Sequence, residues 1–111
     1  MNDLASQSCK PCGAGTPPLA GGDLERLYRQ LEGWTLADGP GGRRLEKEYR
    51  FGDFRLALGF VNRLGEVAET EGHHPDIFLA WGRVKVTLWT HSIGGLSESD
   101  FILAAKADQV L

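Results

Sequence analysis

Hydrophobic residues recur along most of this chain at two periods, and each period predicts one kind of element. Apolar positions spaced by three or four residues predict three helices, over residues 23–32, 53–71 and from 97 onward. Apolar positions that alternate with polar ones predict four strands, over residues 34–37, 43–51, 76–81 and 84–90. Asp23 fits a helix N-cap, Gly33 fits a helix stop, and residues 39–42 read as a turn. The predicted order is therefore α-β-β-α-β-β-α.

The helix predicted over residues 53–71 carries more apolar surface than one core requires. One stripe is expected to face the sheet, while Leu56, Phe60 and Val67 form a second stripe on nearly the opposite side. The first stripe consists of Phe54, Ala57, Leu58, Val61, Leu64, Gly65 and Ala68. Because a contiguous exposed apolar strip usually marks an interface, the second stripe is predicted to pack against another subunit. The alternative is that the first helix of the same chain covers it.

The last two predicted strands are separated only by Gly82 and Arg83, which predicts a hairpin with a two-residue turn. In that register, His74 lies directly across from His91, with the Cβ atoms about 5 Å apart. Pro75 cannot donate a ladder hydrogen bond, so regular pairing is expected to end there. The hairpin therefore predicts that two imidazoles could act on one small ligand.

The chain has three histidines, and all of them stand in one stretch among carboxylates and aromatic residues. The candidate site residues are His73, His74, His91, Glu69, Pro75, Asp76, Trp81 and Asp100. Histidine exchanges protons near neutral pH, so a converging group of three suits a reaction made of proton transfers. Other readings stay open: the histidines could be surface loop residues or zinc ligands with Asp76 or Asp100. Asp100 also completes a Ser-x-x-Asp capping box with Ser97, which is a structural role.

The composition narrows the class of protein. At 111 residues the chain is expected to form one domain. Its net charge of -3 does not indicate the positively charged surface that nucleic-acid binding requires. No stretch approaches the length of a membrane span, and the first residues lack the pattern of a signal peptide. We therefore expect a cytoplasmic protein that binds neither a membrane nor, directly, nucleic acid.

Residues 1–22 differ from the rest, with three prolines, several small residues and no periodicity. They are predicted to form a flexible N-terminal arm, followed by a folded domain over residues 23–111. The arm holds Cys9 and Cys12 in a Cys-x-x-Cys pair. Two reduced thiols on a flexible tail are the simplest interpretation, and metal binding shared between subunits is the alternative.

The spacing of the candidate site residues resembles the signature of the pterin-4a-carbinolamine dehydratase family, also called 4a-hydroxytetrahydrobiopterin dehydratases. The matching run is Glu69-x-x-x-His73-His74-Pro75, then Trp81, His91 and Asp100 at the family's intervals. The resemblance extends from Trp34 to the C-terminus. Two features depart from it: Ile77 stands where many members have an aromatic residue, and the Cys-x-x-Cys arm lies outside the common domain.

The resemblance implies an α+β fold, a four-stranded antiparallel sheet with three helices packed on one face. It implies loss of water from 4a-hydroxytetrahydrobiopterin, giving a quinonoid dihydropterin, with no cofactor and no metal. It also implies a homodimer or homotetramer that recycles a product of aromatic amino-acid hydroxylases. Some relatives serve as binding or assembly factors for transcription or for a carbon-fixing enzyme, so a non-catalytic role is the alternative.

Dehydration needs an acid for the departing hydroxyl and a base for a ring-nitrogen proton, and histidines can supply both. We assign His73 and His91 as the acid–base pair and His74 as the residue that orients the pterin. Asp100 is expected to support a histidine or a pterin nitrogen. Trp81 is expected to form either the pocket wall or part of the core.

Overall fold

The computed structural model describes residues 4–9, 17–40 and 42–111. The principal elements are α1 (Gly21–Tyr28), β1 (Thr35–Gly39), β2 (Gly42–Arg50), α2 (Phe54–Glu71), β3 (Asp76–Ala80), β4 (Arg83–Leu88) and α3 (Glu98–Gln109). Two short 3-10 helices, Leu4–Ser6 and His91–Ile93, complete the set. The predicted order α-β-β-α-β-β-α is confirmed.

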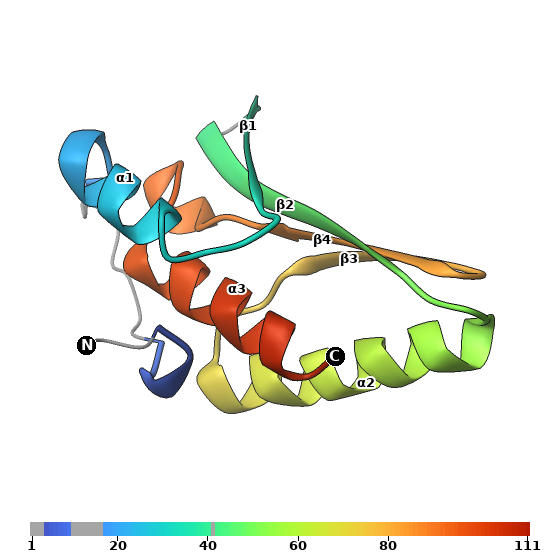
Figure 1. Ribbon diagram of the computed structural model, residues 1–111. Coiled ribbons are helices and arrows are strands. Elements are labelled where there is room, and N and C mark those ends of the chain that lie inside the picture. The colour runs from blue at the N-terminus through green and yellow to red at the C-terminus, as the bar shows by residue number, and fades with distance from the viewer. Residues whose placement is uncertain (1–3, 10–16, 41) are drawn as a thin grey trace.

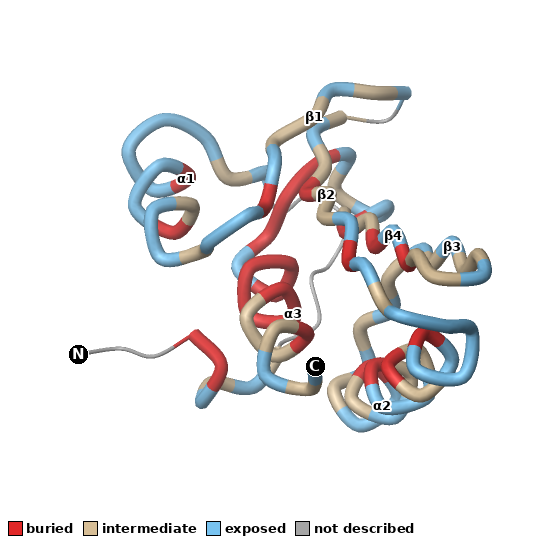
Figure 2. The backbone as a smooth tube through the Cα atoms, turned by 45° about the vertical axis from the view of Figure 1, so that its right-hand side comes forward, coloured by how far each residue is buried: buried red, intermediate tan, exposed pale blue. Residues whose placement is uncertain are grey.

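The four strands form one antiparallel sheet in the order β1-β2-β4-β3. The three helices lie against it in a second layer (Figure 1). Buried residues concentrate in α3, and the two central strands, β2 and β4, contribute further buried residues from one face (Figure 2). Alternate residues of these strands point into one core, where side chains such as Leu45, Val86 and Phe101 are fully buried. The α+β fold expected from the sequence is therefore confirmed.

A polar cluster fastens the C-terminal part of α3 to the sheet. Asp108 of α3 accepts hydrogen bonds from Lys47 Nζ at 2.8 Å, Tyr49 Oη at 2.6 Å and Trp34 Nε1 at 3.1 Å. Burial, followed by the hydrogen bond to Asp108, raises the pKa of Tyr49 well above its ordinary value, so this hydroxyl remains a donor. Two donors come from β2 and the third, Trp34, directly precedes β1, so the cluster sets the position of α3 over the sheet.

The ends of α1 differ from the prediction, because the helix runs over Gly21–Tyr28 rather than 23–32. Ala20 is the N-cap, and Asp23 lies in the first turn, where a carboxylate interacts favourably with the helix dipole. At the other end, the backbone N–H groups of Gln30 and Leu31 bond three residues back instead of four. The helix thus ends in a tightened turn before Gly33.

The predicted division of α2 into two stripes is wrong in detail. Phe60, assigned to the outer stripe, is fully buried, and Val67 packs half-buried against the core. Phe54 and Leu58, assigned to the core stripe, are exposed, as is Leu56. The helix faces the core along a line between the two stripes, formed by Ala57, Phe60, Leu64 and Ala68. Packing against another subunit stays a prediction.

The predicted register of the β3–β4 hairpin is shifted by two residues. Ala80 pairs with Arg83, so the turn is formed by Trp81 and Gly82. The cause is a tertiary contact: Phe51 N donates to Gly82 O at 2.9 Å, and a Cβ on Gly82 would lie 2.8 Å from Phe51 O. A shift of two residues keeps each side chain on its predicted face. It does, however, remove His91 from the position across from His74.

The described part of the N-terminal arm, Leu4–Cys9, is not a free tail. Leu4 and Ala5 are buried, and Leu4 belongs to the main core cluster beside α3. These residues pack against the folded domain, because an apolar side chain within the segment, Leu4, completes the core. The division into an arm over residues 1–22 and a domain over residues 23–111 stays a prediction. Cys12 lies outside the described residues. In the ranges that the structure covers, no helix has both the length and the apolar character needed to cross a membrane.

Candidate active site

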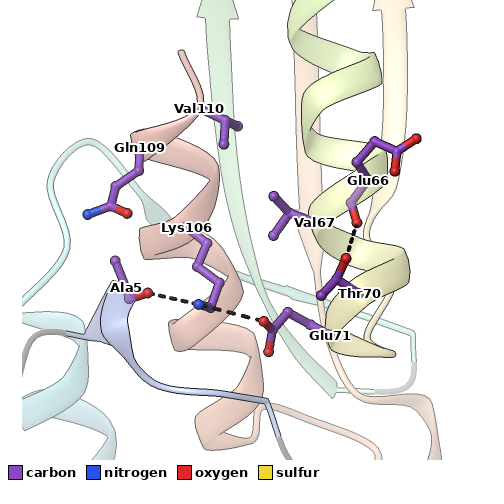
Figure 3. A pocket seen from close by; sticks show the side chains of 8 residues that line it. All are labelled: Ala5, Glu66, Val67, Thr70, Glu71, Lys106, Gln109 and Val110. Atoms are coloured by element: carbon purple, nitrogen blue, oxygen red, sulfur yellow. Dashed lines mark hydrogen bonds and ion pairs between the residues drawn. The ribbon is translucent and has the colours of Figure 1, made fainter.

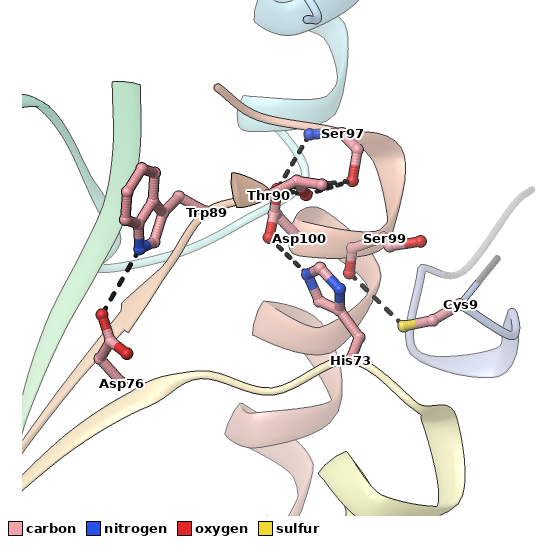
Figure 4. Close-up of polar contacts among 8 residues, drawn as sticks. All are labelled: Cys9, His73, Asp76, Trp89, Thr90, Ser97, Ser99 and Asp100. Atoms are coloured by element: carbon pink, nitrogen blue, oxygen red, sulfur yellow. Dashed lines mark hydrogen bonds and ion pairs between the residues drawn. The ribbon is translucent and has the colours of Figure 1, made fainter. Parts of the chain in front are cut away.

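A buried pair of His73 and Asp100 forms the centre of the candidate site (Figure 4). His73 Nε2 lies 2.6 Å from Asp100 Oδ1; the aspartate side chain is fully buried and the imidazole is 16% exposed. Gly72 ends α2 in the left-handed conformation, with φ of 68°. Because a left-handed C-cap reverses the chain direction, the next residue, His73, points back toward the start of α3.

The second oxygen of Asp100 is also occupied. Oδ2 accepts from Thr90 Oγ1 at 2.7 Å and from the backbone N–H of Ser97 at 2.9 Å. Ser97 and Asp100 form the capping box that the sequence predicted at the start of α3. The Thr90 and Ser97 hydroxyls also bond each other at 2.8 Å. Asp100 therefore caps the helix with one oxygen and holds the histidine with the other.

This arrangement determines which ring nitrogen of His73 is available for chemistry. An ionised carboxylate only accepts hydrogen bonds, so the contact with Asp100 places a proton on His73 Nε2. Nδ1 is then the nitrogen left to exchange a proton with another molecule. A carboxylate that fixes one ring nitrogen is the usual way in which proteins set the tautomer of a reactive histidine.

His91 stands on the loop that leaves β4. Paired backbone hydrogen bonds between Thr90 and Gly95, the shorter at 2.8 Å, close this loop. The start of β2 presses against it, since a Cβ on Gly42 would lie 1.9 Å from Gly94 O. Gly42 also has a φ of 119°, which L side chains rarely adopt. The exposed ring of His91 is thus carried on a loop that is fixed at both ends.

Trp89 supports the His91 ring, and sequence reasoning missed it. The two ring centroids lie 3.8 Å apart, and Trp89 Nε1 donates to Asp76 Oδ2 at 3.4 Å. On β2, the Arg44 guanidinium lies 4.2 Å from the Trp89 ring centroid. The signal lay in the hairpin register, because the observed register extended outward places Trp89, not His91, across from His74, and the sequence predicted a register shifted by two residues.

His74 has a different and more open setting. Its Nε2 lies 3.1 Å from Glu69 Oε1, with side chains 59% and 78% exposed. At that exposure an ion pair contributes little to stability. His74, Glu69 and Pro75 line part of a cavity of about 430 Å³, together with Ile77. The carboxylate can orient this imidazole, while solvent and small molecules can reach it.

The structure brings some of the predicted residues together and separates others. His73 and Asp100 are in contact, His74 contacts Glu69, and Asp76 reaches the His91 loop through Trp89. Trp81 is 67% exposed in the hairpin turn. Since a strand rises about 3.3 Å per residue, Trp81 lies roughly 17 Å from Asp76 at the other end of β3. Within one chain Trp81 is neither core nor a wall shared with the histidines.

Within residues 4–9, 17–40 and 42–111, no group of three or more His, Cys, Asp or Glu side chains is placed to hold a metal ion. Cys9 donates to a backbone oxygen, Ser99 O, at 3.5 Å. The proposed metal pair of Cys9 with Cys12 involves a residue outside the described part.

On this α+β fold, a helix-capping aspartate holds a partly buried histidine, and two exposed histidines stand in the same stretch of the chain. Such a site is suited to acid–base chemistry. Comparison with known proteins agrees: the family model described as pterin 4 alpha carbinolamine dehydratase matches residues 17–110. The chain belongs to this family.

Relatives and solved structures support this assignment. A protein of Rubrobacter xylanophilus is 53% identical over 110 residues, covering 99% of this chain and all of its own. One of Alkaliphilus metalliredigens is 50% identical, covering 98% and 96%. Both are named "Putative pterin-4-alpha-carbinolamine dehydratase".

Two solved structures share the fold. A transcriptional coactivator/pterin dehydratase from Brucella melitensis matches with a TM-score of 0.76 and 35% identity, covering 84% of this chain and 97% of its own. A pterin dehydratase-like protein described as a RuBisCO assembly factor in the alpha-carboxysome matches with a TM-score of 0.61 and 25% identity, covering 71% and 89%. The two matching structures are therefore described in different roles.

Proposed function

We propose that this protein catalyses the loss of water from 4a-hydroxytetrahydrobiopterin, giving quinonoid dihydrobiopterin. The family membership supplies the substrate class, and the buried pair of His73 and Asp100 is the observation that carries the proposal. A carboxylate fixes one nitrogen of an imidazole that is only 16% exposed. That is the arrangement which general acid–base catalysis requires, since it holds the ring in one orientation and one tautomer.

The reaction consists of one bond broken, one proton removed and one double bond formed. The C4a–O bond breaks, an acid delivers a proton to the departing hydroxyl, and a base removes the proton of the neighbouring ring nitrogen. The C4a–N bond becomes double, and water leaves. No electrons are exchanged with another molecule, so two positioned acid–base groups suffice, each contributing about 10²–10⁴-fold.

In this proposal His73 and His91 are the acid–base pair. His73 uses Nδ1, because Nε2 is held by Asp100 at 2.6 Å. His91 is exposed and supported by Trp89, so its ring can meet a substrate without first being released from a hydrogen bond to a carboxylate. A planar pterin between these rings could also stack on the Trp89 indole, as aromatic rings do.

His74 is proposed to orient the pterin from the cavity that it lines with Glu69, Pro75 and Ile77. Glu69 keeps its ring in place, at 3.1 Å from Nε2. Asp76 contributes indirectly, by accepting the hydrogen bond of the Trp89 indole. Trp81 has no role in the single chain, and a role for it requires a second subunit at the hairpin turn.

The physiological setting follows from the chemistry. Aromatic amino-acid hydroxylases generate 4a-hydroxypterins, so we propose that the protein serves such a hydroxylase in the cytoplasm by recycling tetrahydrobiopterin. A homodimer or homotetramer is proposed, formed in part through the exposed apolar residues of α2, Phe54, Leu56 and Leu58.

The direct test is to follow the decay of 4a-hydroxytetrahydrobiopterin with and without the purified protein. The wild type should accelerate decay, and His73→Ala should lose at least about 100-fold of that acceleration while keeping its oligomeric state. A loss of tenfold or less would contradict the assignment of His73. The rate should be unchanged by a chelator, whereas elemental analysis showing a stoichiometric metal would favour a metal-binding module.

A second candidate function is a binding or assembly role without turnover. It is favoured by the match to the structure described as a RuBisCO assembly factor, at 25% identity. The two functions separate in one assay: an assembly factor would leave the decay of the hydroxypterin unchanged. The presence of His73, His74, His91 and Asp100 together favours the enzyme.

A further inference from the structure

The N-terminal segment Leu4–Cys9, here called the strap, lies across the ends of α2 and α3. Leu4 is 3% exposed and Ala5 is 8% exposed. Lys106 of α3 donates to Ala5 O at 2.8 Å, and its Nζ also lies 3.7 Å from Glu71 Oε2 of α2 (Figure 3). The strap, α2 and α3 are therefore joined by one half-buried lysine.

Cys9, at the other end of the strap, contacts both helices itself. Its backbone N–H donates to Glu71 Oε1 at 2.8 Å, and its thiol donates to Ser99 O at 3.5 Å. Glu71 precedes His73 by two residues, and Ser99 directly precedes Asp100. One residue thus bridges the two chain segments that carry the histidine and its carboxylate. Figure 4 shows the contact of Cys9 with Ser99 beside the His73–Asp100 pair.

The carboxylate at the centre of this bridge has both oxygens engaged. Glu71 Oε1 accepts from Cys9, Oε2 faces Lys106, and the side chain is only 14% exposed. A half-buried carboxylate with two partners restricts its neighbours more than an exposed one does, because solvent competes less for its hydrogen bonds. The contacts of Glu71 with Cys9 and Lys106 therefore restrict the movement of the end of α2 relative to the strap.

We propose that Cys9 is a positioning residue for the dehydration: by joining Glu71 to Ser99 it keeps His73 Nε2 within hydrogen-bond distance of Asp100. This inference rests on the function proposed above. The family model matches residues 17–110 and so leaves the strap outside its range. Positioning matters here because a displacement of about 1 Å in a catalytic group can cost roughly 100-fold in rate.

The protonation state of the thiol is consistent with this role. Burial, followed by the negative charge of Glu71, raises the pKa of Cys9 to about 11. The thiol consequently stays protonated near neutral pH and can donate to Ser99 O. Its proposed task is to hold structure, and the low thiolate fraction makes it a poor nucleophile.

The experiment uses the full chain and two disruptive variants, Cys9→Ala and Glu71→Ala, with one conservative variant of each. Cys9→Ser keeps a donor, and Glu71→Gln keeps an acceptor for the Cys9 N–H. Ser8→Ala is the matched control in the strap, since Ser8 is exposed. For α2 the control is Thr70→Ala, because the Thr70 hydroxyl bonds only within its own helix, to Glu66 O at 3.0 Å.

Two measurements are made on each variant: kcat and KM for the dehydration, and the exchange rate of the His73 Nε2–H proton with water, read by NMR. We expect each disruptive variant to lower kcat roughly three- to tenfold, with KM within about twofold, and to speed the exchange of that proton. The conservative variants should recover most of both signals, and the two controls should match the wild type.

The outcomes separate this inference from the proposed function. Unchanged proton exchange together with a kcat within twofold of wild type in Cys9→Ala would overturn the positioning role. Equal effects from Ser8→Ala and Cys9→Ala would overturn it too. If the wild type shows no dehydration but Cys9→Ala still speeds exchange of the His73 proton, the proposed function fails while the bridge to the His73–Asp100 pair stands.

Discussion

Replacing Asp100 by asparagine separates the two tasks that its carboxylate performs. The amide has the same shape, and its oxygen can still accept from the Ser97 N–H, now at 2.9 Å, and from the Thr90 hydroxyl, now at 2.7 Å. Its NH₂ group then faces His73 Nε2, so two donors oppose each other unless the ring proton moves to Nδ1. The variant thus keeps the helix cap and reverses the histidine tautomer.

The two expected effects have different sizes. Stability should fall by only about 1 kcal/mol, because the cap hydrogen bond survives and mainly the charge at the helix N-terminus is lost. The dehydration rate should fall by at least about 100-fold, since His73 would present a donor where the reaction needs an acceptor, or the reverse. Asp100→Ala should cost more stability, about 2–4 kcal/mol, because it leaves the buried Ser97 N–H and His73 without their partner.

Urea unfolding and the hydroxypterin decay assay measure the two effects on the same preparation. Asp53→Asn is the matched control, because Asp53 caps α2 by accepting from Leu56 N at 2.8 Å and contacts no histidine. It should show a similar small loss of stability with an unchanged rate. An Asp100→Asn variant whose rate stays within threefold of wild type would show that Asp100 is only a helix cap, and the reasoning about His73 would be refuted.

Three further predictions concern stability and thiol reactivity. In a Cys12→Ser background, Cys9 should be alkylated at pH 8 at least about tenfold more slowly than a thiol with an ordinary pKa. The pKa of Cys9 in the folded protein, about 11, lies above the ordinary 9.0. Its contribution to the free energy of unfolding should therefore be complete below pH 9 and disappear toward pH 11, as urea unfolding would show. Asp108→Ala should lower the free energy of unfolding by about 2–4 kcal/mol, since it leaves the donors of Trp34, Lys47 and Tyr49 without their acceptor. A change below about 1 kcal/mol would argue against the proposed role of Asp108 in fixing α3 to the sheet. Gly42→Ala should cost about 2 kcal/mol or more, because its Cβ would meet the His91 loop at 1.9 Å, and thermal unfolding measures this.

The sequence predicted best those features that depend on local interactions. The capping box of Ser97 with Asp100 joins residues three apart, and it is present in the structure. The element order followed from periodicity for the same reason. The pairing of His73 with Asp100 was expected only as support for a histidine or a pterin nitrogen, because residues 27 apart meet through the fold and not through the pattern.

The features that the sequence missed depend on contacts between distant elements. The hairpin register was wrong because Phe51, outside the hairpin, bonds Gly82 and selects the turn. Cys9 was read as part of a flexible arm because no periodicity in residues 1–22 shows that Leu4 enters a core built by other elements. Trp89 was overlooked because its contact with His91 depends on that register.

The most direct test of the central claim follows the absorbance of 4a-hydroxytetrahydrobiopterin in the presence of wild-type protein, Asp100→Asn and Asp53→Asn. The account predicts rapid decay with wild type and with Asp53→Asn, and decay slowed by at least about 100-fold with Asp100→Asn. Decay at the same rate with wild type as in buffer alone would contradict it, and the fold would then belong to a binding factor.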